Sequence, residues 1–124
     1  MARYLIAEDD VPLAHFLRRS LQPNKYDIRL AHDGEAALKE VSTSAYRLLI
    51  LDLNLPKKHG YDVLEHMRRS ARCSETPVVV VSTSDSARDR ARVAGLGVSR
   101  YLRKPSEYAD LLTLRDAVKD ALET

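Results

Sequence analysis

Short apolar runs alternate along this chain with stretches that are apolar on one side only. The runs lie at residues 4–7, 26–31, 48–51, 78–81 and 98–102 and indicate strands. The runs 48–51 and 78–81 are continuously apolar, which is typical of central parallel strands covered on both faces. The runs 26–31 and 98–102 alternate polar and apolar residues, which favours places nearer an edge of the sheet.

The stretches between the runs carry apolar residues at helical spacing. These are Leu13, Phe16, Leu17 and Leu21; Ala37, Leu38 and Val41; Val63, Leu64, Met67 and Ala71; Ala87, Ala91 and Ala94; and Leu111, Leu114, Val118 and Leu122. We expect Asp10 to cap the first helix, with Pro12 close to its first turn. The fourth helix has a weak stripe made of alanines alone and ends at Gly95.

The alternation of strands and helices predicts an α/β fold. It should contain a five-stranded parallel sheet with right-handed crossovers and with helices on both faces. In such open sheets, ligands bind beyond the carboxyl ends of the strands. The residues that follow each strand are therefore the candidates for chemistry.

The composition narrows the class of protein further. The 124 residues are 44% hydrophobic and 31% charged, and the net charge of +2 comes from interspersed acids and bases, which argues against a nucleic-acid surface. No apolar run reaches membrane-spanning length, and the N-terminus turns acidic too early for a signal peptide. The single cysteine, Cys73, fits a reducing compartment. We expect a cytoplasmic protein with neither a nucleic-acid nor a membrane partner.

Acidic, hydroxyl and ammonium groups follow four of the five predicted strands. They are Glu8, Asp9 and Asp10 after the first strand, Asp52 after the third, Ser82, Thr83 and Ser84 after the fourth, and Lys104 with Pro105 after the fifth. A polar residue after a strand is usually a turn former or a helix cap, so each position alone carries little weight. Their conjunction at one end of a sheet is much harder to obtain from capping alone.

Elementary electrostatics restricts what such a cluster can be. Carboxylates held close together repel one another, and a hard divalent cation relieves that repulsion. Carboxylates with a backbone carbonyl suit Mg²⁺, whereas zinc would favour histidine or cysteine ligands. Asp52, fixed at the end of a central strand, could attack a phosphoryl group and form an aspartyl phosphate. Mg²⁺ held by Asp9 and Asp52 would neutralise charge on one side of that group, and Lys104 on another.

Taken together, these segments resemble the receiver (response-regulator) domain of two-component signalling over essentially the whole chain. The motifs are the acidic pair Glu8-Asp9, "LDLNLPKKHG" around Asp52, "PVVVVSTS" with Ser82, and "YLRKP" with Lys104 and Pro105. The resemblance implies a flavodoxin-like, doubly wound sheet of strand order 2-1-3-4-5. It also implies one receiver domain over residues 1–124 with no output domain. The segment "LDLNLPKKHGYDVLEHMR" looks most like single-domain receivers that pair with phytochrome-type sensor kinases.

The resemblance further implies a role for each matched residue. Asp52 would be the phospho-acceptor, and Mg²⁺ would be bound by Asp9, Asp52, the backbone carbonyl of Asn54 and, through a water, Glu8. Ser82 would be the switch hydroxyl, Tyr101 the aromatic whose rotamer follows it, and Lys104 the phosphoryl contact beside a cis bond to Pro105. Four positions depart from the usual pattern: Glu8 replaces Asp, Ser82 replaces Thr, Arg100 a smaller residue and His59 an acid. We interpret His59 as a solvated loop residue.

The implied function is a signalling phospho-acceptor, not an enzyme beyond slow self-dephosphorylation. A sensor histidine kinase would donate the phosphoryl group, and a downstream protein or phosphotransfer partner would respond to a changed surface on the fourth helix, fifth strand and fifth helix. That region carries Arg88, Arg90, Arg92, Arg100 and Arg103. The arginines indicate either a solvated face or a protein contact, including a homodimer contact.

Two other functions stay open from the residues alone. One is a Mg²⁺-dependent phosphohydrolase with Asp52 as nucleophile, although a phosphatase of the haloacid type would want an acid where Asn54 stands. The other is a flavodoxin-like flavin binder. Such a protein needs aromatic walls and a phosphate-binding loop after the first strand, where this chain has "EDDVP" and no tryptophan.

Overall fold

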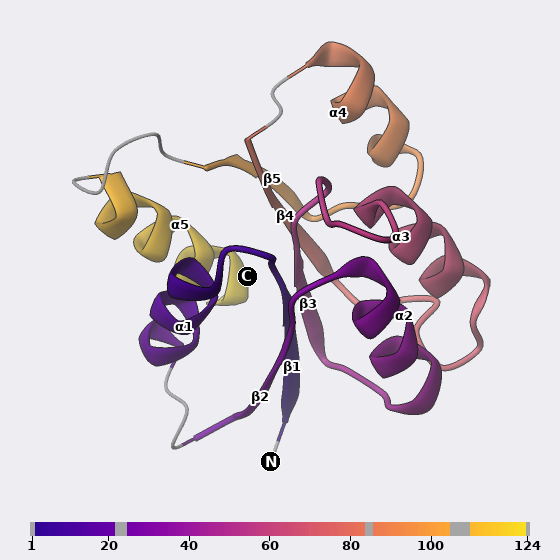
Figure 1. Cartoon of the computed structure of the whole chain (residues 1–124), viewed down its shortest axis with the longest axis horizontal. Helices are drawn as coiled ribbons and strands as arrows, with labels where there is room; N and C mark the ends of the chain where they lie inside the picture. The colour runs from indigo at the N-terminus through magenta and orange to yellow at the C-terminus, as the bar shows by residue number, and fades with distance from the viewer. Residues whose placement is uncertain (1, 22–24, 84–85, 105–109, 124) are drawn as a thin grey trace.

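Ten elements alternate from strand to helix in the computed structural model, which describes residues 2–21, 25–83, 86–104 and 110–123 (Figure 1). The strands are β1 (Arg3–Ala7), β2 (Asp27–Ala31), β3 (Leu48–Leu51), β4 (Val78–Ser82) and β5 (Arg100–Arg103). The helices are α1 (Val11–Ser20), α2 (Gly34–Thr43), α3 (Gly60–Arg69), α4 (Ala87–Ala94) and α5 (Leu111–Glu123). The structure does not describe the predicted cis bond at Pro105, the hydroxyl of Ser84 or the side chain of Leu122.

The five strands form one parallel sheet in the order β2-β1-β3-β4-β5, which confirms the predicted fold. Every residue of β3 and β4 is buried, as their continuous apolar runs predict. In β5 the two end residues are exposed and the two middle residues are half-buried, as befits an edge strand. Since all strands point the same way, their carboxyl ends meet along one edge of the sheet.

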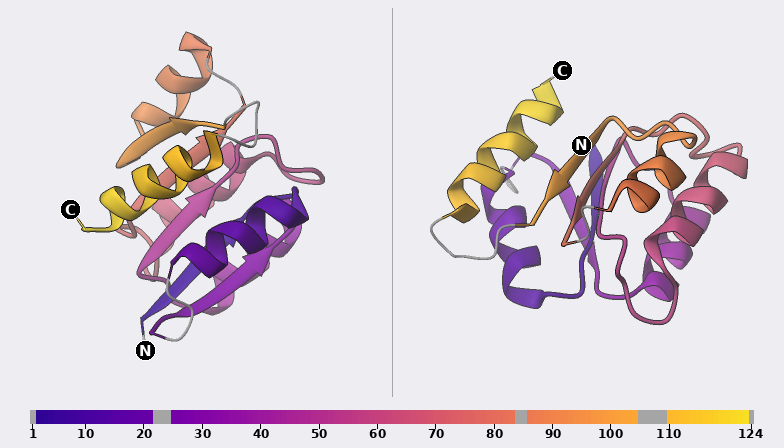
Figure 2. Two further views of the ribbon diagram at one scale, coloured as in Figure 1. Left: turned by 90° about the vertical axis from the view of Figure 1, so that its left-hand side faces the viewer. Right: turned by 90° about the horizontal axis from the view of Figure 1, so that it is seen from above.

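The helices form two layers, one on each face of the sheet. Helices α1 and α5 cover one face, and α2, α3 and α4 cover the other (Figures 1 and 2). Successive residues of β1 divide between the layers: Leu5 packs toward α2 and α3, and Ile6 packs toward α1 and α5. Within the described residues, no helix combines the length and the apolarity that crossing a membrane requires.

Two of the predicted apolar stripes are wrong in detail. Helix α3 ends at Arg69, because Ser70 adopts an extended conformation and its Oγ accepts the Arg72 N–H at 3.2 Å, so Ala71 is exposed in the following turn. In α4, the three alanines expected to face the core are exposed, and Val93 is the buried residue. A valine removes more apolar surface from water than an alanine, so the helix is turned to bury Val93.

Side chains cap the helices that begin near the carboxyl edge of the sheet. Asp10 caps α1 as predicted, accepting the Leu13 N–H at 3.1 Å. His59 corrects the expectation of a solvated loop residue: it is half-buried, and its Nδ1 accepts the Tyr61 N–H at 3.0 Å as the cap of α3. A ring nitrogen thus does at this position what an oxygen usually does at a helix start.

Two glycines allow the loop after β3 to pack closely against its neighbours. A Cβ on Gly60 would lie 2.4 Å from the backbone oxygen of Asp52, and one on Gly34 would lie 1.9 Å from that of Lys58. The Gly60 N–H donates to Leu53 O at 2.8 Å, and the Gly34 N–H donates to Pro56 O at 2.9 Å. The backbone of Asp52 and of the loop that follows it is therefore fixed by contacts that only glycine permits.

Candidate functional site

The carboxyl ends of β1, β3 and β5 bring three charged side chains into contact. Lys104 Nζ lies 2.7 Å from Oε1 and 2.8 Å from Oε2 of Glu8, and 2.9 Å from Oδ2 of Asp52. Both carboxylate side chains are 3% exposed and the lysine side chain is 11% exposed. The structure therefore joins three of the predicted site residues in one buried charged cluster.

Backbone hydrogen bonds hold these three residues in place. Each follows the last residue of its strand, yet its N–H still donates to the neighbouring strand: Glu8 to Ala31 O at 2.9 Å, Asp52 to Ala7 O at 2.9 Å, and Lys104 to Ser82 O at 2.8 Å. A residue held on the sheet in this way loses little further freedom when it binds a ligand. The cluster is preorganised by the ladder of the parallel sheet.

Asp9 completes a group of acids suited to a divalent cation. Asp9 itself is exposed, but one carboxylate oxygen from each of Glu8, Asp9 and Asp52 lies within 4.8 Å of the others. Three carboxylates are the ligand type that Mg²⁺ and similar hard cations prefer, and exposure of Asp9 leaves room for the waters that Mg²⁺ retains. The residues present fit such an ion.

Burial and charge shift the ionisation of this cluster in opposite directions. Burial raises the pKa of Glu8 from 4.5 to about 7, although the hydrogen bond from Lys104 lowers it. Burial also disfavours the ammonium of Lys104, but its bonds to Glu8 and Asp52 outweigh this effect and raise its pKa. For Asp9, burial acts to raise the pKa, but hydrogen bonds with Glu8 and Asp52 and the charge of Lys104 together outweigh it and lower the pKa. Lys104 is thus the counter-ion that the chain itself supplies to its buried acids.

Hydroxyl groups lie at the end of β4, the strand that pairs with β3. Ser82 is fully buried, and Thr83 beside it is exposed. The Asn54 side-chain amide donates to Ser82 Oγ at 3.4 Å and to Thr83 Oγ1 at 3.3 Å, while its backbone N–H donates to Asp52 Oδ1 at 3.1 Å. Asn54 therefore links the acid to the hydroxyls, a side-chain role that the sequence did not reveal.

Tyr101 lies on β5, three positions before Lys104. It is half-buried on β5, where it pairs with Val80, and the guanidinium carbon of Arg90 lies 4.4 Å from the centre of its ring. The predicted switch aromatic is therefore in contact with α4. The sequence predicted the residue but not its arginine partner, because the spacing of Arg90 and Tyr101 follows no local pattern.

Two further contacts fix the segment that carries the first acids. The ring nitrogen Nδ1 of His32 lies 3.0 Å from the backbone oxygen of Glu8, and the Asp10 N–H donates to Glu8 Oε2 at 3.0 Å. His32 follows β2, the strand that pairs with β1. The position of His32 after a strand was the available signal, but only the strand order makes it a neighbour of Glu8.

Several arginines of the predicted partner surface are engaged within the chain. Besides the contact between Arg90 and Tyr101, the guanidinium of Arg92 lies 3.8 Å from the centre of the Tyr61 ring, and Arg100 Nη2 lies 3.2 Å from Asp120 Oδ2. Arg92 joins α4 to α3, and Arg100 joins β5 to α5. Much of this charge thus holds α4 and β5 to their neighbours.

Comparison with known proteins agrees with this geometry. Residues 4–116 match the response regulator receiver domain. The chain is 33% identical over 110 residues to the transcriptional regulatory protein DltR of Streptococcus agalactiae and 34% identical over 110 residues to the response regulator MprA of Mycobacterium ulcerans, covering 89% of this chain in each case. The match covers 48% and 47% of those proteins, so the chain spans about half the length of the curated relatives it matches.

Solved structures of response regulators have the same fold. The Mn²⁺-bound form of Rcp1 has a TM-score of 0.87 and 26% identity, with 97% of this chain and 93% of that chain covered. The phosphorylated cyanobacterial phytochrome response regulator RcpA has a TM-score of 0.86 and 25% identity, with coverage of 96% and 91%. TrrA of Thermotoga maritima, solved with Mg²⁺ and BeF, has a TM-score of 0.75 and 25% identity, with coverage of 98% and 99%.

Proposed function

Because the chain belongs to the response regulator receiver domain family, we propose that Asp52 accepts a phosphoryl group from a sensor histidine kinase. The observation that carries this proposal is the contact of Lys104 with Glu8 and Asp52 at the carboxyl edge of the sheet. This arrangement provides a fixed carboxylate, a nearby cation and acids suited to a metal. Similarity to RcpA, which is described as phosphorylated, supports the same conclusion.

In the proposed reaction, one oxygen of Asp52 attacks the phosphorus of the kinase phosphohistidine. The new bond is an acyl phosphate, the phosphorus–nitrogen bond breaks, and the leaving imidazole takes a proton. Such transfer depends on positioning and on charge neutralisation rather than on covalent help from the protein. Lys104 would then contact the phosphoryl oxygens as a point charge, and Glu8 would retain part of its bond to Lys104.

Mg²⁺ is the expected cofactor of this reaction. Asp9, Asp52 and the backbone carbonyl of Asn54 would hold it directly, and Glu8 through a water. When bound, the ion supplies charge neutralisation at the transferring phosphoryl group. The Mn²⁺-bound form of Rcp1 and the complex of TrrA with Mg²⁺, which share this fold, support a divalent cation as cofactor.

Phosphorylation would act by shifting a two-state equilibrium. Ser82 would hydrogen-bond a phosphoryl oxygen, Tyr101 would turn inward, and the surface of α4, β5 and α5 would change. A downstream protein or phosphotransfer partner would read that surface, which is also where two copies of the chain would associate if it forms a homodimer. Similarity to RcpA supports a phytochrome-type kinase as the donor. A cytoplasmic location and no catalysis beyond slow self-dephosphorylation complete the proposal.

The test is labelling of Asp52. Wild-type protein and the Asp52→Asn variant are incubated with Mg²⁺ and either acetyl phosphate or a phosphorylated kinase, and the gain of one phosphoryl group is measured by intact mass. Asp52→Asn should lose all labelling, whereas Asp62→Asn, which changes an exposed aspartate of α3, should keep it. Undiminished labelling of Asp52→Asn would refute the assignment of the acceptor.

Two further measurements define the function. Phosphotransfer profiling against the sensor kinases of the source organism identifies the donor as the kinase that labels the chain fastest, and a phytochrome-type kinase is expected. Turnover of p-nitrophenyl phosphate measures hydrolysis directly. Turnover faster than loss of the acyl phosphate would instead favour a phosphohydrolase.

A further inference from the structure

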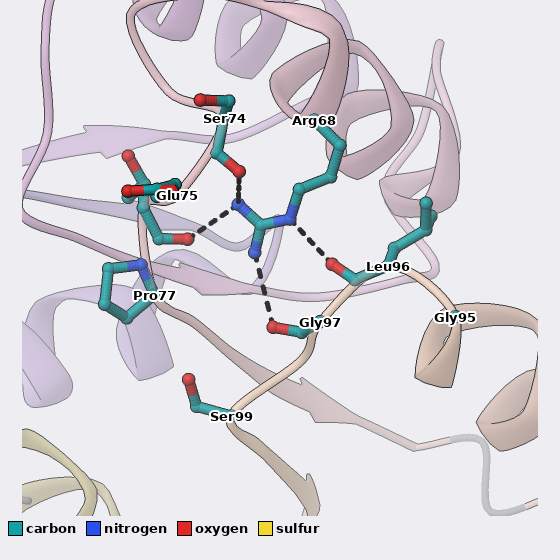
Figure 3. A pocket seen from close by; sticks show the side chains of 9 residues that line it. Arg68, Ser74, Glu75, Pro77, Gly95, Leu96, Gly97 and Ser99 are labelled. Atoms are coloured by element: carbon teal, nitrogen blue, oxygen red, sulfur yellow. Dashed lines mark hydrogen bonds between the residues drawn. The ribbon is translucent and has the colours of Figure 1, made fainter.

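Arg68, in the last turn of α3, joins two loops at the end of the sheet opposite Asp52. Its guanidinium donates to five backbone oxygens, and Figure 3 shows the bonds to the residues that line the adjacent pocket. The partners are Cys73 O at 3.3 Å, Ser74 O at 3.3 Å, Thr76 O at 2.8 Å, Leu96 O at 2.6 Å and Gly97 O at 3.4 Å. Hydrogen bonds from a charged donor are stronger than those between neutral groups. One side chain thus ties the loop before β4 to the loop before β5.

The loop before β4 is a fixed frame for this contact. Thr76 is buried, and its hydroxyl donates to Tyr46 O at 3.2 Å. The next residue, Pro77, accepts the Leu49 N–H through its backbone oxygen at 3.0 Å, which joins the loop to β3. Cys73 is also fully buried. Arg68 therefore joins Leu96 and Gly97 to a loop that is itself anchored to the sheet.

The loop before β5 carries the C-terminal end of α4. The N–H groups of Leu96 and Gly97 donate to Val93 O at 2.9 Å and to Ala94 O at 3.4 Å, which closes the last turn of the helix. Gly97 has a φ of 73°, which L side chains rarely adopt. The carbonyls of these same two residues accept from Arg68, so the arginine fixes the end of α4 rather than only a passing loop.

The rest of α4 is held by fewer and weaker contacts. Within the described helix only Val93, near the C-terminal end, is buried. Arg90 contacts the ring of Tyr101, the residue that the proposed switch would move. Arg92 contacts Tyr61 on α3, but Arg92 is exposed, and such contacts are weak at exposed sites. The helix is thus held at its C-terminal end by Arg68, and it contacts the proposed switch residue through Arg90 in its middle.

A pocket lies beside Arg68, between the two loops that Arg68 connects. Residues of both loops line an open pocket of about 430 Å³ with Arg68 on its wall (Figure 3). The backbone oxygens of Thr76, Leu96 and Gly97 that a ligand would contact there already accept from the guanidinium. Arg68 therefore has a structural role here: its planar guanidinium, with several N–H donors, connects both loops.

We propose that Arg68 is a positioning residue of the switch, holding the C-terminal end of α4 at Leu96 and Gly97 while its N-terminal end moves. This inference rests on the proposed function, since it concerns the change that follows phosphorylation. According to this proposal, α4 pivots about Leu96 and Gly97 when Tyr101 turns. The partner surface then changes near Arg90 and stays constant near Gly97.

Amide hydrogen exchange of the wild-type protein tests the pivot without any substitution. Exchange is measured before and after phosphorylation by acetyl phosphate and Mg²⁺, with intact mass confirming the acyl phosphate. The amides of Asp89 and Arg90 should change at least about fivefold, and those of Leu96, Gly97 and Ser99 less than about twofold. Equal changes at both ends of α4 would overturn the pivot. Failure to form the acyl phosphate contradicts the proposed function instead.

Variants of Arg68 test whether its hydrogen bonds to Leu96 and Gly97 hold the end of α4 in the unphosphorylated protein. Arg68→Met should speed exchange at Leu96 and Gly97 at least about tenfold relative to Arg69→Met, which changes a neighbour whose side chain is 78% exposed. Arg68→Lys keeps the charge without the planar guanidinium and should give an intermediate exchange rate. This variant replaces Arg68→Met in the comparison if Arg68→Met does not fold. After phosphorylation, the variants at position 68 should show changes that extend to Ser99. If the amides of Leu96 and Gly97 exchange as slowly in both variants at position 68 as in Arg69→Met, Arg68 does not hold the end of α4.

Discussion

Among the single residues of the site, Lys104 determines the balance of charge. Its ammonium contacts both buried acids, and no more than 11% of its side chain is exposed. A buried carboxylate that loses its counter-ion is strongly destabilising unless it is protonated or finds another cation. The same oxygens are candidates for a divalent ion, so the lysine and the ion share the task of neutralising Glu8 and Asp52.

Replacement of Lys104 by methionine should make the fold depend on a divalent cation. In EDTA, the free energy of unfolding should fall by about 2–4 kcal/mol, because the two acids lose their shared partner. Saturating Mg²⁺ should then raise the Tm of Lys104→Met by several degrees more than that of the wild type. Thermal unfolding with and without Mg²⁺ measures this, and Lys39→Met, an exposed lysine of α2, is the control. An equal response to Mg²⁺ in all three proteins would contradict the prediction.

At the scale of elements, the site depends on how closely α2 and α3 approach the loop after β3. The backbone of Gly60 lies against that of Asp52, and Gly34 lies against Lys58. Lys57 between them has a φ of 69°, so the loop also contains a residue in a left-handed conformation. Because backbone atoms leave no flexible side chain to move aside, this packing tolerates no added carbon.

A methyl group at Gly60 should therefore cost far more than one at Gly95. Gly60→Ala would place Cβ 2.4 Å from Asp52 O, and relief of that clash must shift the acceptor itself. We expect a loss of about 2–4 kcal/mol in the free energy of unfolding and slower labelling by acetyl phosphate. Gly95→Ala has open space and a φ of −70°, so it should change stability by less than about 1 kcal/mol. Urea denaturation compares the two, and equal costs would mean that the close approach is not essential.

At the scale of the whole molecule, the parallel sheet gathers distant residues at one edge. Lys104 and Glu8 are 96 positions apart in the sequence, and Lys104 and Asp52 are 52 apart. The charged cluster therefore exists only in the folded chain, where it is buried. A group whose pKa changes when the chain folds makes the stability of the entire fold depend on pH.

The stability of the protein in EDTA should fall between pH 5 and pH 7.5 because of Glu8. Its pKa is about 7 in the fold and 4.5 as an ordinary glutamate, so the folded state binds more protons in this range and the free energy of unfolding decreases as pH rises. Relative to Glu8→Gln, the wild type should lose about 1–3 kcal/mol across the range. Urea denaturation at both pH values gives the difference. An advantage of the wild type that grows with pH would show that Glu8 is ionised throughout.

Local pattern was sufficient for most of the architecture. Continuous apolar runs predicted β3 and β4 as buried central strands, and an acid before an apolar stripe predicted the Asp10 cap. Both signals depend on residues that are near one another in the sequence, where periodicity and capping chemistry operate. Position after a strand was likewise enough to identify Glu8, Asp52 and Lys104 as candidates for one site.

The sequence by itself determined the order of elements and the residues offered at the carboxyl edge of the sheet. Only the tertiary structure decided which face of α4 is buried, that Asn54 bridges to Ser82, and that Arg68 fastens two loops. Asn54 and Ser82 are 28 positions apart in the sequence, as are Arg68 and Leu96. Each contact depends on how a helix or loop is turned against its neighbours. No local pattern encodes that rotation, because it results from the packing of the whole core.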